Sequence, residues 1–298
     1  MAGETLRRTI SQLSSAATTL AGLGLALERQ LSGSPLDPAL AGPIDRLIET
    51  LGLTDLGELS EPELRQALGE VRMTAIQAAL LVQSGPVQPG WAHLDEEMLI
   101  SIGDASALFA GVVQRLLVPN LPGLGDRLAT PGAAFLDVGV GVGSIALAMA
   151  RAFPTLQVVG IDPWTPALSI ARRRTEAAGL ADRISLRQET CQALADHEAY
   201  ALVVFPGPFI QRDATPQALE RLSDAIRPDG WIAFGQLNLG ADPLKATAAD
   251  VRTAYWGEGI GDPAEAAAAL SAAGFVDVRP LPSPPEALMA IVAGRRPA

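Results

Sequence analysis

The stretch AAFLDVGVGVGSIALAMARAFPTLQVVGIDPWTPAL, residues 133–168, carries the strongest structural signal in the chain. It begins with an apolar run, residues 134–138, which is too short for a buried helix and is followed at once by glycines, so it predicts a buried parallel strand. Residues 144–153 then show helical apolar spacing, and a second apolar run, residues 156–161, ends in Asp162. The order of strand, glycine turn, helix, strand and acid predicts a βαβ nucleotide-binding unit.

The turn of this unit contains Gly139, Gly141 and Gly143, which alternate with valines. Missing side chains at these points let the backbone bend sharply and let a ligand lie directly against it. Gly141 and Gly143, with Ala146, also satisfy the G-x-G-x-x-G/A dinucleotide fingerprint, for which Asp162 would bind ribose hydroxyls. A nicotinamide enzyme is therefore one interpretation of the stretch.

Asp137 argues against a dinucleotide, because it lies at the same strand end and points a carboxylate toward the position of a pyrophosphate. S-adenosylmethionine (SAM) has no phosphate and carries an ammonium and a sulfonium, for which an acid is a suitable neighbour. The pattern Asp137-x-Gly139-x-Gly141-x-Gly143, followed by Asp162, resembles motif I and the ribose-binding acid of the class I SAM-dependent methyltransferases. The resemblance covers residues 133–293.

This resemblance implies an α/β fold, a Rossmann-like, doubly wound seven-stranded methyltransferase sheet with an antiparallel final pair. It also implies SAM as the cofactor and S-adenosylhomocysteine (SAH) as the product. Helical patterns before the sheet predict an all-helical cap or dimerisation domain over residues 1–125 and a SAM-binding domain over residues 126–298. The Pro- and Gly-rich residues 118–132 are the predicted linker. This arrangement resembles that of bacterial, actinomycete-like small-molecule methyltransferases of secondary metabolism.

The predicted cofactor site lies at the carboxyl edge of the sheet. In related methyltransferases an acid after the third strand accepts a hydrogen bond from the adenine amino group, whereas this chain has Thr190 there, directly after Glu189. A hydroxyl can still accept that bond. Cys191 fits a small buried filler better than a nucleophile, because no basic residue is adjacent to it. The predicted cofactor-binding residues are Asp137, Gly139, Gly141, Gly143, Asp162, Pro163, Trp164, Glu189, Thr190, Cys191 and Phe205.

The acceptor side is predicted where the fourth strand runs into Pro206-Gly207-Pro208-Phe209. This position resembles the Asn/Asp-Pro-Pro-Tyr/Phe motif of amino methyltransferases, but Phe205 replaces the polar first residue. Methylation of a base amine or an amide is therefore disfavoured, and an apolar wall over the methyl group is favoured. The aromatic residues Tyr255 and Trp256 fit an acceptor pocket or a loop anchor. The predicted substrate-binding residues are Trp91, Pro206, Phe209, Gln236, Tyr255 and Trp256.

SAM is an activated electrophile, so the protein mainly has to orient the acceptor and exclude water. An oxygen or acidic carbon acceptor would also benefit from a general base, for which His93 is the candidate. His93 lies in the Pro- and Gly-rich residues 84–97, which also fit a plain surface loop. We therefore predict O- or C-methylation of a small molecule. A cyclase or pericyclase that uses SAM non-reactively and a non-catalytic SAM-binding interaction protein are the alternatives.

The net charge of −11 argues against nucleic acid and acidic membranes as partners, because both require a basic surface. The single cysteine excludes an intramolecular disulfide, and two histidines with one cysteine give no zinc-binding spacing, so we predict no metal.

The amino-terminal segment contains Arg7 and Arg8 before an apolar stretch and resembles a twin-arginine signal. The acidic Glu4 weakens the resemblance to a signal. No uninterrupted run reaches the roughly 18 apolar residues of a membrane span. We therefore predict a cytoplasmic protein. Apolar residues from Leu6 to Leu31 recur at spacings of four and three, which is a heptad seam. The seam fits either packing within the domain or a homodimer.

Overall fold

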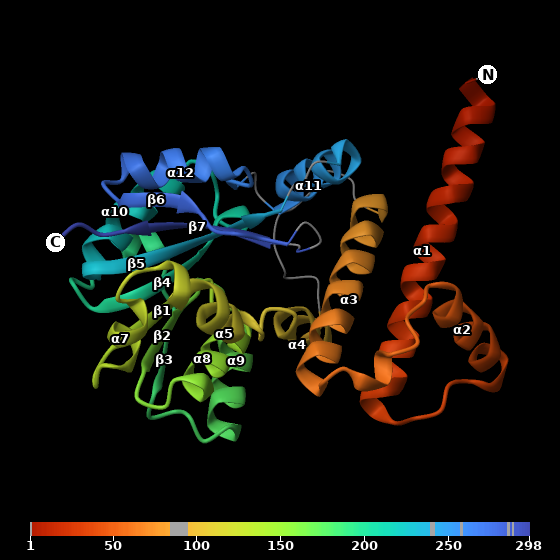
Figure 1. Cartoon of the computed structure of the whole chain (residues 1–298), viewed down its shortest axis with the longest axis horizontal. Helices are drawn as coiled ribbons and strands as arrows, with labels where there is room; N and C mark the ends of the chain where they lie inside the picture. The colour runs from red at the N-terminus through yellow and green to blue at the C-terminus, as the bar shows by residue number, and fades with distance from the viewer. Residues whose placement is uncertain (1, 84–94, 239–241, 257–258, 285–286, 288) are drawn as a thin grey trace. The chain divides into compact units, whose positions relative to one another are not determined.

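The computed structural model describes residues 2–83, 95–238, 242–256, 259–284, 287 and 289–298 (Figure 1). Within these residues the chain forms two compact units. The first comprises residues 2–83 and 95–108, and the second begins at residue 109 and continues to the end of the chain.

The first unit is helical throughout its regular structure. Asp37 begins its second helix by accepting the N–H of Ala39 at 2.8 Å, and Pro38 stands in the first turn, where no backbone donor is needed. Its helices are α1 (Ala2–Ser32), α2 (Pro38–Thr50), the short η1 (Leu56–Glu58), α3 (Glu61–Gln83) and α4 (Glu96–Asp104). The all-helical character predicted for this region is confirmed.

Only the second half of α1 is packed within the unit. Leu27 is buried with residues of α3, and a Cβ atom at Gly22 would lie 2.4 Å from Leu47 Cδ2, so the glycine permits close approach of α2. In the first half of the helix, Leu6, Ile10 and Leu13 are exposed. The heptad seam thus packs within the domain along one half and faces outward along the other.

The second unit is built on a seven-stranded sheet with the order β3-β2-β1-β4-β5-β7-β6. Strands β1 to β5 are parallel, while β7 runs antiparallel to both β5 and β6. The predicted sheet and its antiparallel final pair are confirmed. The strands are β1 (Ala134–Val138), β2 (Gln157–Ile161), β3 (Ile184–Arg187), β4 (Tyr200–Pro206), β5 (Ile226–Leu237), β6 (Val276–Pro280) and β7 (Met289–Arg295).

Helices cover both faces of this sheet (Figure 1). Alternate residues of each strand point to opposite faces, so Phe135 joins the core under one helix layer and Leu136 the core under the other. One layer contains α5 (Phe109–Val112), the π-helical η2 (Val113–Leu117), α6 (Val118–Asn120), α7 (Leu124–Ala129), α8 (Ser144–Ala152) and α9 (Thr165–Ala177). The other contains α10 (Thr215–Ala225) and α12 (Pro263–Ala272).

The segment predicted as a linker, residues 118–132, is instead part of the second unit's core. Leu121, Leu124 and Leu128 are fully buried against the sheet. Trp231 Nε1 donates to the Pro122 carbonyl at 3.3 Å, and Arg279 Nη2 donates to the Asn120 carbonyl at 2.6 Å. The compact units therefore divide between residues 108 and 109 rather than near residue 125.

Two helical stretches, Ala2–Ser32 and Glu96–Asn120, have the length and composition of a membrane span. Core helices and signal sequences pass the same test, and the first stretch lies near the N-terminus. The sequence contains no uninterrupted apolar run of this length, whereas the mean hydropathy of these two helices is high enough for a membrane span.

Gly160 provides a test of the packing between β2 and its neighbours. A Cβ atom there would lie 2.6 Å from Val140 Cγ2 and 2.9 Å from Leu186 Cδ2. We expect Gly160→Ala to lower the free energy of unfolding by about 1–3 kcal/mol through overpacking. Urea unfolding followed by circular dichroism measures this change. Gly57→Ala is the control, because a Cβ atom there meets nothing within 4 Å; equal midpoints for the two variants would contradict the prediction.

Candidate functional site

The strand order places a switch point between β1 and β4. From β1 the chain continues to β2 and β3 on one side, while β4 and β5 lie on the other. Ligands of doubly wound sheets bind in the crevice outside the carboxyl ends of the strands at such a point. The register pairs Val138 with Ile161 and Asp137 with Val204, so the ends of β1, β2 and β4 lie at one edge.

The glycine loop after β1 is built from left-handed backbone. Gly139, Gly141 and Gly143 have φ values of 70°, 53° and 82°, which explains why all three positions carry glycine. The Gly139 and Val140 amides donate to the Ile161 carbonyl at 2.8 and 3.0 Å, which fixes the loop to the end of β2. Gly143 then caps the amino terminus of α8.

Asp162 connects the loop with the segment after β2. Its Oδ2 accepts the Gly141 N–H at 3.0 Å, and its Oδ1 accepts the Trp164 N–H at 2.8 Å. Burial raises the pKa of Asp162, while these N–H groups of Trp164 and Gly141 lower it. Pro163 is exposed and Trp164 is half-buried beside this carboxylate.

Asp137 lies at the end of β1 and is only 2% exposed. Burial and, to a smaller extent, the charge of Asp162 raise its pKa to about 8, while a backbone hydrogen bond from Ala146 lowers it. In the described part of the chain its Oδ2 atom has no hydrogen-bond partner. A cation placed near the loop would favour the ionised form of this carboxyl group.

Arg174 of α9 is a site residue that the sequence analysis missed. Its Nη1 donates to the Val142 carbonyl at 3.0 Å and to Ser144 Oγ at 2.9 Å, so it holds the loop from behind. A run of three arginines, residues 172–174, suggests a solvated helix face, which fits the exposed Arg172 and Arg173 but not the half-buried Arg174. Helical spacing from the buried Ala171 could have identified it.

The edge after β3 holds the predicted adenine-binding residues. The Glu189 N–H donates to the Asp162 carbonyl at 3.3 Å, which places this edge beside the predicted ribose-binding acid. Glu189 Oε2 lies 3.4 Å from Arg187 Nε, and Thr190 is exposed at the start of η3 (Cys191–Ala193). Cys191 is buried, and burial raises the pKa of its thiol, in agreement with a packing role.

The acceptor side follows β4 in η4 (Gly207–Phe209). Pro206 Cγ lies 3.4 Å from the position of a Cβ atom at Gly139, so Pro206 adjoins the loop, and Phe209 is partly exposed. Phe205 is fully buried, with its ring centroid 4.9 Å from that of Phe234, so its side chain belongs to the core. Gln236 is also fully buried, and neither of its amide atoms has a partner among the described residues.

Four predicted residues cannot be placed as side chains. Trp91 and His93 lie outside the described residues. Tyr255 and Trp256 end helix α11 (Pro243–Trp256), but their side chains also lie outside the described part. The structure therefore brings together the loop glycines, both acids, Trp164 and Pro206.

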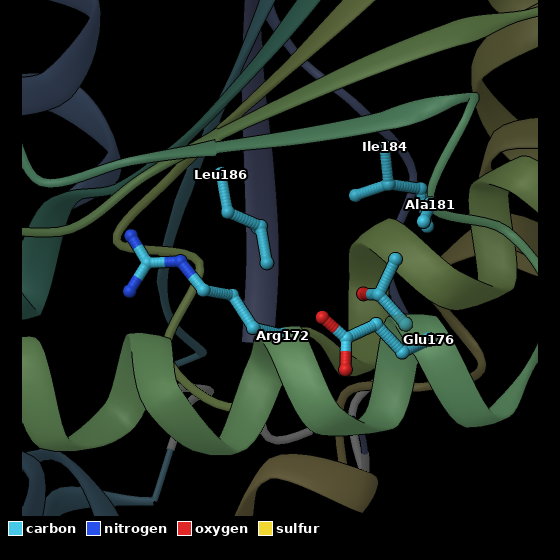
Figure 2. A pocket seen from close by; sticks show the side chains of 6 residues that line it. Arg172, Glu176, Ala181, Ile184 and Leu186 are labelled. Carbon is cyan, nitrogen blue, oxygen red and sulfur yellow. The ribbon is translucent and has the colours of Figure 1, made fainter.

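A hollow of about 100 Å³ lies apart from these residues, between α9 and β3 (Figure 2). Figure 2 shows side chains of α9 on one side of it and those of β3 on the other. It is lined by Arg172, Thr175, Glu176, Ala181, Ile184 and Leu186. Within the described ranges, no group of three or more His, Cys, Asp or Glu residues is arranged to hold a metal ion.

A family model described as "Methyltransferase domain" matches residues 135–230. The release factor glutamine methyltransferase of Vibrio cholerae is 34% identical over 88 residues, which are 30% of this chain and 31% of that protein. The malonyl-[acyl-carrier protein] O-methyltransferase of Xylella fastidiosa is 29% identical over 130 residues, 43% of this chain and 42% of that protein. The chain thus matches less than half the length of these curated relatives.

Solved structures resemble the chain over nearly its whole length. Human N-acetylserotonin methyltransferase in complex with SAM has a TM-score of 0.65 at 17% identity and covers 98% of each chain. The mitomycin 7-O-methyltransferase MmcR has a TM-score of 0.61 at 20% identity and covers 99% of each chain. These likenesses confirm the predicted fold, including the helical region before the sheet.

Arg174 allows a test of the loop support. We expect Arg174→Met to weaken SAH binding about tenfold or more, because a charge-assisted hydrogen bond contributes about 1.5–3 kcal/mol. Isothermal titration calorimetry measures the affinity, and Arg172→Met, an exposed arginine of the same helix, is the control. An Arg174→Met protein that folds and binds SAH like the wild type would refute the role.

Asp137 predicts a pH dependence of SAM binding. Below about pH 8 the ligand-free protein holds a proton on Asp137, and a cationic ligand favours its release. Affinity should therefore rise from pH 6 to pH 8, by at most about tenfold per pH unit for one proton. Calorimetry in buffers of different ionisation enthalpy counts the protons released. Asp137→Asn removes the titrating carboxyl group, so its pH profile shows the contribution of the ligand's own amino group alone. If Asp137→Asn has the same pH profile as the wild type, Asp137 is not the group that releases the proton.

Proposed function

We propose that this chain, whose residues 135–230 form a class I SAM-dependent methyltransferase domain, transfers a methyl group to an oxygen or carbon atom of a small molecule. The observation that carries the proposal is the glycine loop together with the buried carboxyl group of Asp137, whose Oδ2 atom has no hydrogen-bond partner among the described residues. A cationic cofactor would favour the ionised form of this carboxyl group and be stabilised by it, whereas a pyrophosphate would keep the group protonated and gain no such stabilisation.

The residues at the switch point fit SAM, which supplies a methyl group already activated on a sulfonium. Asp137 would favour the positive charge of the cofactor, and Asp162 would accept hydrogen bonds from the ribose hydroxyls. Glu189 and Thr190 form the edge that would meet the adenine. The glycines let the cofactor lie against the backbone, and Pro206 forms the wall on the acceptor side.

A small-molecule acceptor is favoured over a macromolecule. The curated relatives include methyltransferases of release factors and of ribosomal RNA, such as the ribosomal RNA small subunit methyltransferase H of Nocardia farcinica. A net charge of −11 disfavours nucleic acid, and the buried Phe205 replaces the polar residue that would hold an amide or amine. The mitomycin 7-O-methyltransferase and the pyocyanin biosynthetic protein PhzM share the fold, which supports a place in secondary metabolism.

The first unit is proposed to act as a cap and a dimerisation domain. Leu6, Ile10 and Leu13 extend the seam of α1 outward, and the equivalent face of a second copy would cover them. His93 remains the proposed general base, with Trp91, Tyr255 and Trp256 on the acceptor side. A cytoplasmic location is proposed because the inferred cofactor is found there.

Calorimetry with SAM and SAH tests the proposed function. We expect micromolar binding to the wild type, weakened by at least about tenfold in Asp162→Ala through loss of charge-assisted hydrogen bonds. Gly141→Val should also lose binding, because valine does not adopt a φ of 53° without strain. Asp182→Ala, which removes an exposed acid, is the matched control.

The second step incubates the loaded enzyme with small phenols, enols and acids and detects one added methyl group by mass spectrometry. No binding at millimolar SAM would contradict the proposal. Tight binding without methyl transfer to any acceptor would favour a cyclase, a pericyclase or a SAM-binding interaction protein instead.

A further inference from the structure

Helix α11 presents a cation on its packed side. Ala249 is buried, and Arg252 and Thr253, three and four residues later, are half-buried on the same face. Asp250 and Val251 are exposed on the other side. Arg252 therefore faces the protein rather than solvent.

The packed side of α11 adjoins the acceptor side of the site. The helix follows β5 beyond the carboxyl edge of the sheet (Figure 1), and it packs on η4. Thr253 Oγ1 lies 3.1 Å from the position of a Cβ atom at Gly261, and a Cβ atom at Gly259 would lie 2.3 Å from the Gly207 carbonyl oxygen. Since Pro206 in turn adjoins Gly139, a continuous set of contacts leads from α11 to the glycine loop.

Arg252 has no counter-charge among the described residues. Its Nε atom is buried without a hydrogen-bond partner, and none of the described carboxylates forms an ion pair with it. Burial lowers the pKa of its guanidinium. By contrast, Arg187, Arg212 and Arg295 of the same unit all contact carboxylates. A half-buried cation without a partner is unfavourable until an anion satisfies it.

We propose that Arg252 binds a carboxylate of the methyl acceptor, so that the enzyme prefers acidic acceptors over neutral ones. The planar guanidinium matches a carboxylate with two parallel hydrogen bonds, which a point charge would not provide. In a protein with a net charge of −11, an unpaired arginine at this position selects for an anion locally. The inference rests on the proposed methyltransferase function, because it assigns the substrate class of the same site.

The test uses the full-length protein saturated with SAH and three pairs of probes: benzoate and benzamide, para-hydroxybenzoate and para-hydroxybenzamide, and salicylate and salicylamide. Calorimetry should show that the wild type binds the acids about tenfold or more tightly than the amides. Arg252→Gln should lose this preference, and Arg252→Lys should keep part of it. Arg151→Gln is the charge-matched control, because Arg151 is exposed in the last turn of α8.

Three results would overturn the assignment: no preference for acids in the wild type, an unchanged preference in Arg252→Gln, or weaker SAH binding in Arg252→Gln. The last result would mean that Arg252 holds the carboxylate of the cofactor. Failure of the wild type to bind SAH would instead refute the methyltransferase proposal. Methyl transfer to neutral acceptors with no acid preference would refute only the role of Arg252.

Stability gives a readout that does not depend on the probes. Arg252→Leu should leave the unfolding midpoint of the ligand-free protein unchanged or raise it, because it removes an unpaired cation. Arg295→Leu should lower the midpoint, because it breaks contacts with Asp277, at 2.7 Å, and Asp229. An equal drop in both variants would show that Arg252 is paired, contrary to the proposal.

Discussion

The carboxylate of Asp162 is the constraint on which the site depends. It accepts one N–H from the glycine loop and one from the segment after β2, so a single side chain sets the distance between the two halves of the βαβ unit. Arg174 holds the same loop from the side of α9. With the loop fixed from two directions, the three left-handed glycines present backbone rather than side chains to a ligand.

The same site also contains an unsatisfied buried polar group, the carboxyl group of Asp137. Its Oδ2 atom is buried without a partner in the described part of the chain, which destabilises the ligand-free domain by about 1–3 kcal/mol for an unsatisfied buried polar group. A cationic cofactor would relieve this cost when it binds. In the proposed function, the same side chain would therefore link cofactor binding to domain stability.

The sequence predicted the βαβ unit, the sheet and its final antiparallel pair, because glycine positions and apolar spacing are local signals. The prediction of a linker over residues 118–132 was wrong, because it relied on the prolines and glycines there. Leucines at positions 117, 121, 124 and 128 follow a spacing of four, three and four, which is itself helical. Arg174 was missed because a basic run suggests a solvated face. The orientation of Phe205 into the core depends on strand register, which composition does not reveal.

The glycines at 207 and 259 have a further consequence. A Cβ atom at either position would collide with its surroundings, at 2.1 Å from Phe234 Cε1 for Gly207 and at 2.3 Å from the Gly207 oxygen for Gly259. The backbone at Gly207 and Gly259, near α11, is therefore packed too closely to accommodate any side chain. If α11 contacts the methyl acceptor as proposed, substitutions on its packed face would change which acceptors bind while this backbone and the cofactor loop stay the same, so new substrate ranges would arise from one helix.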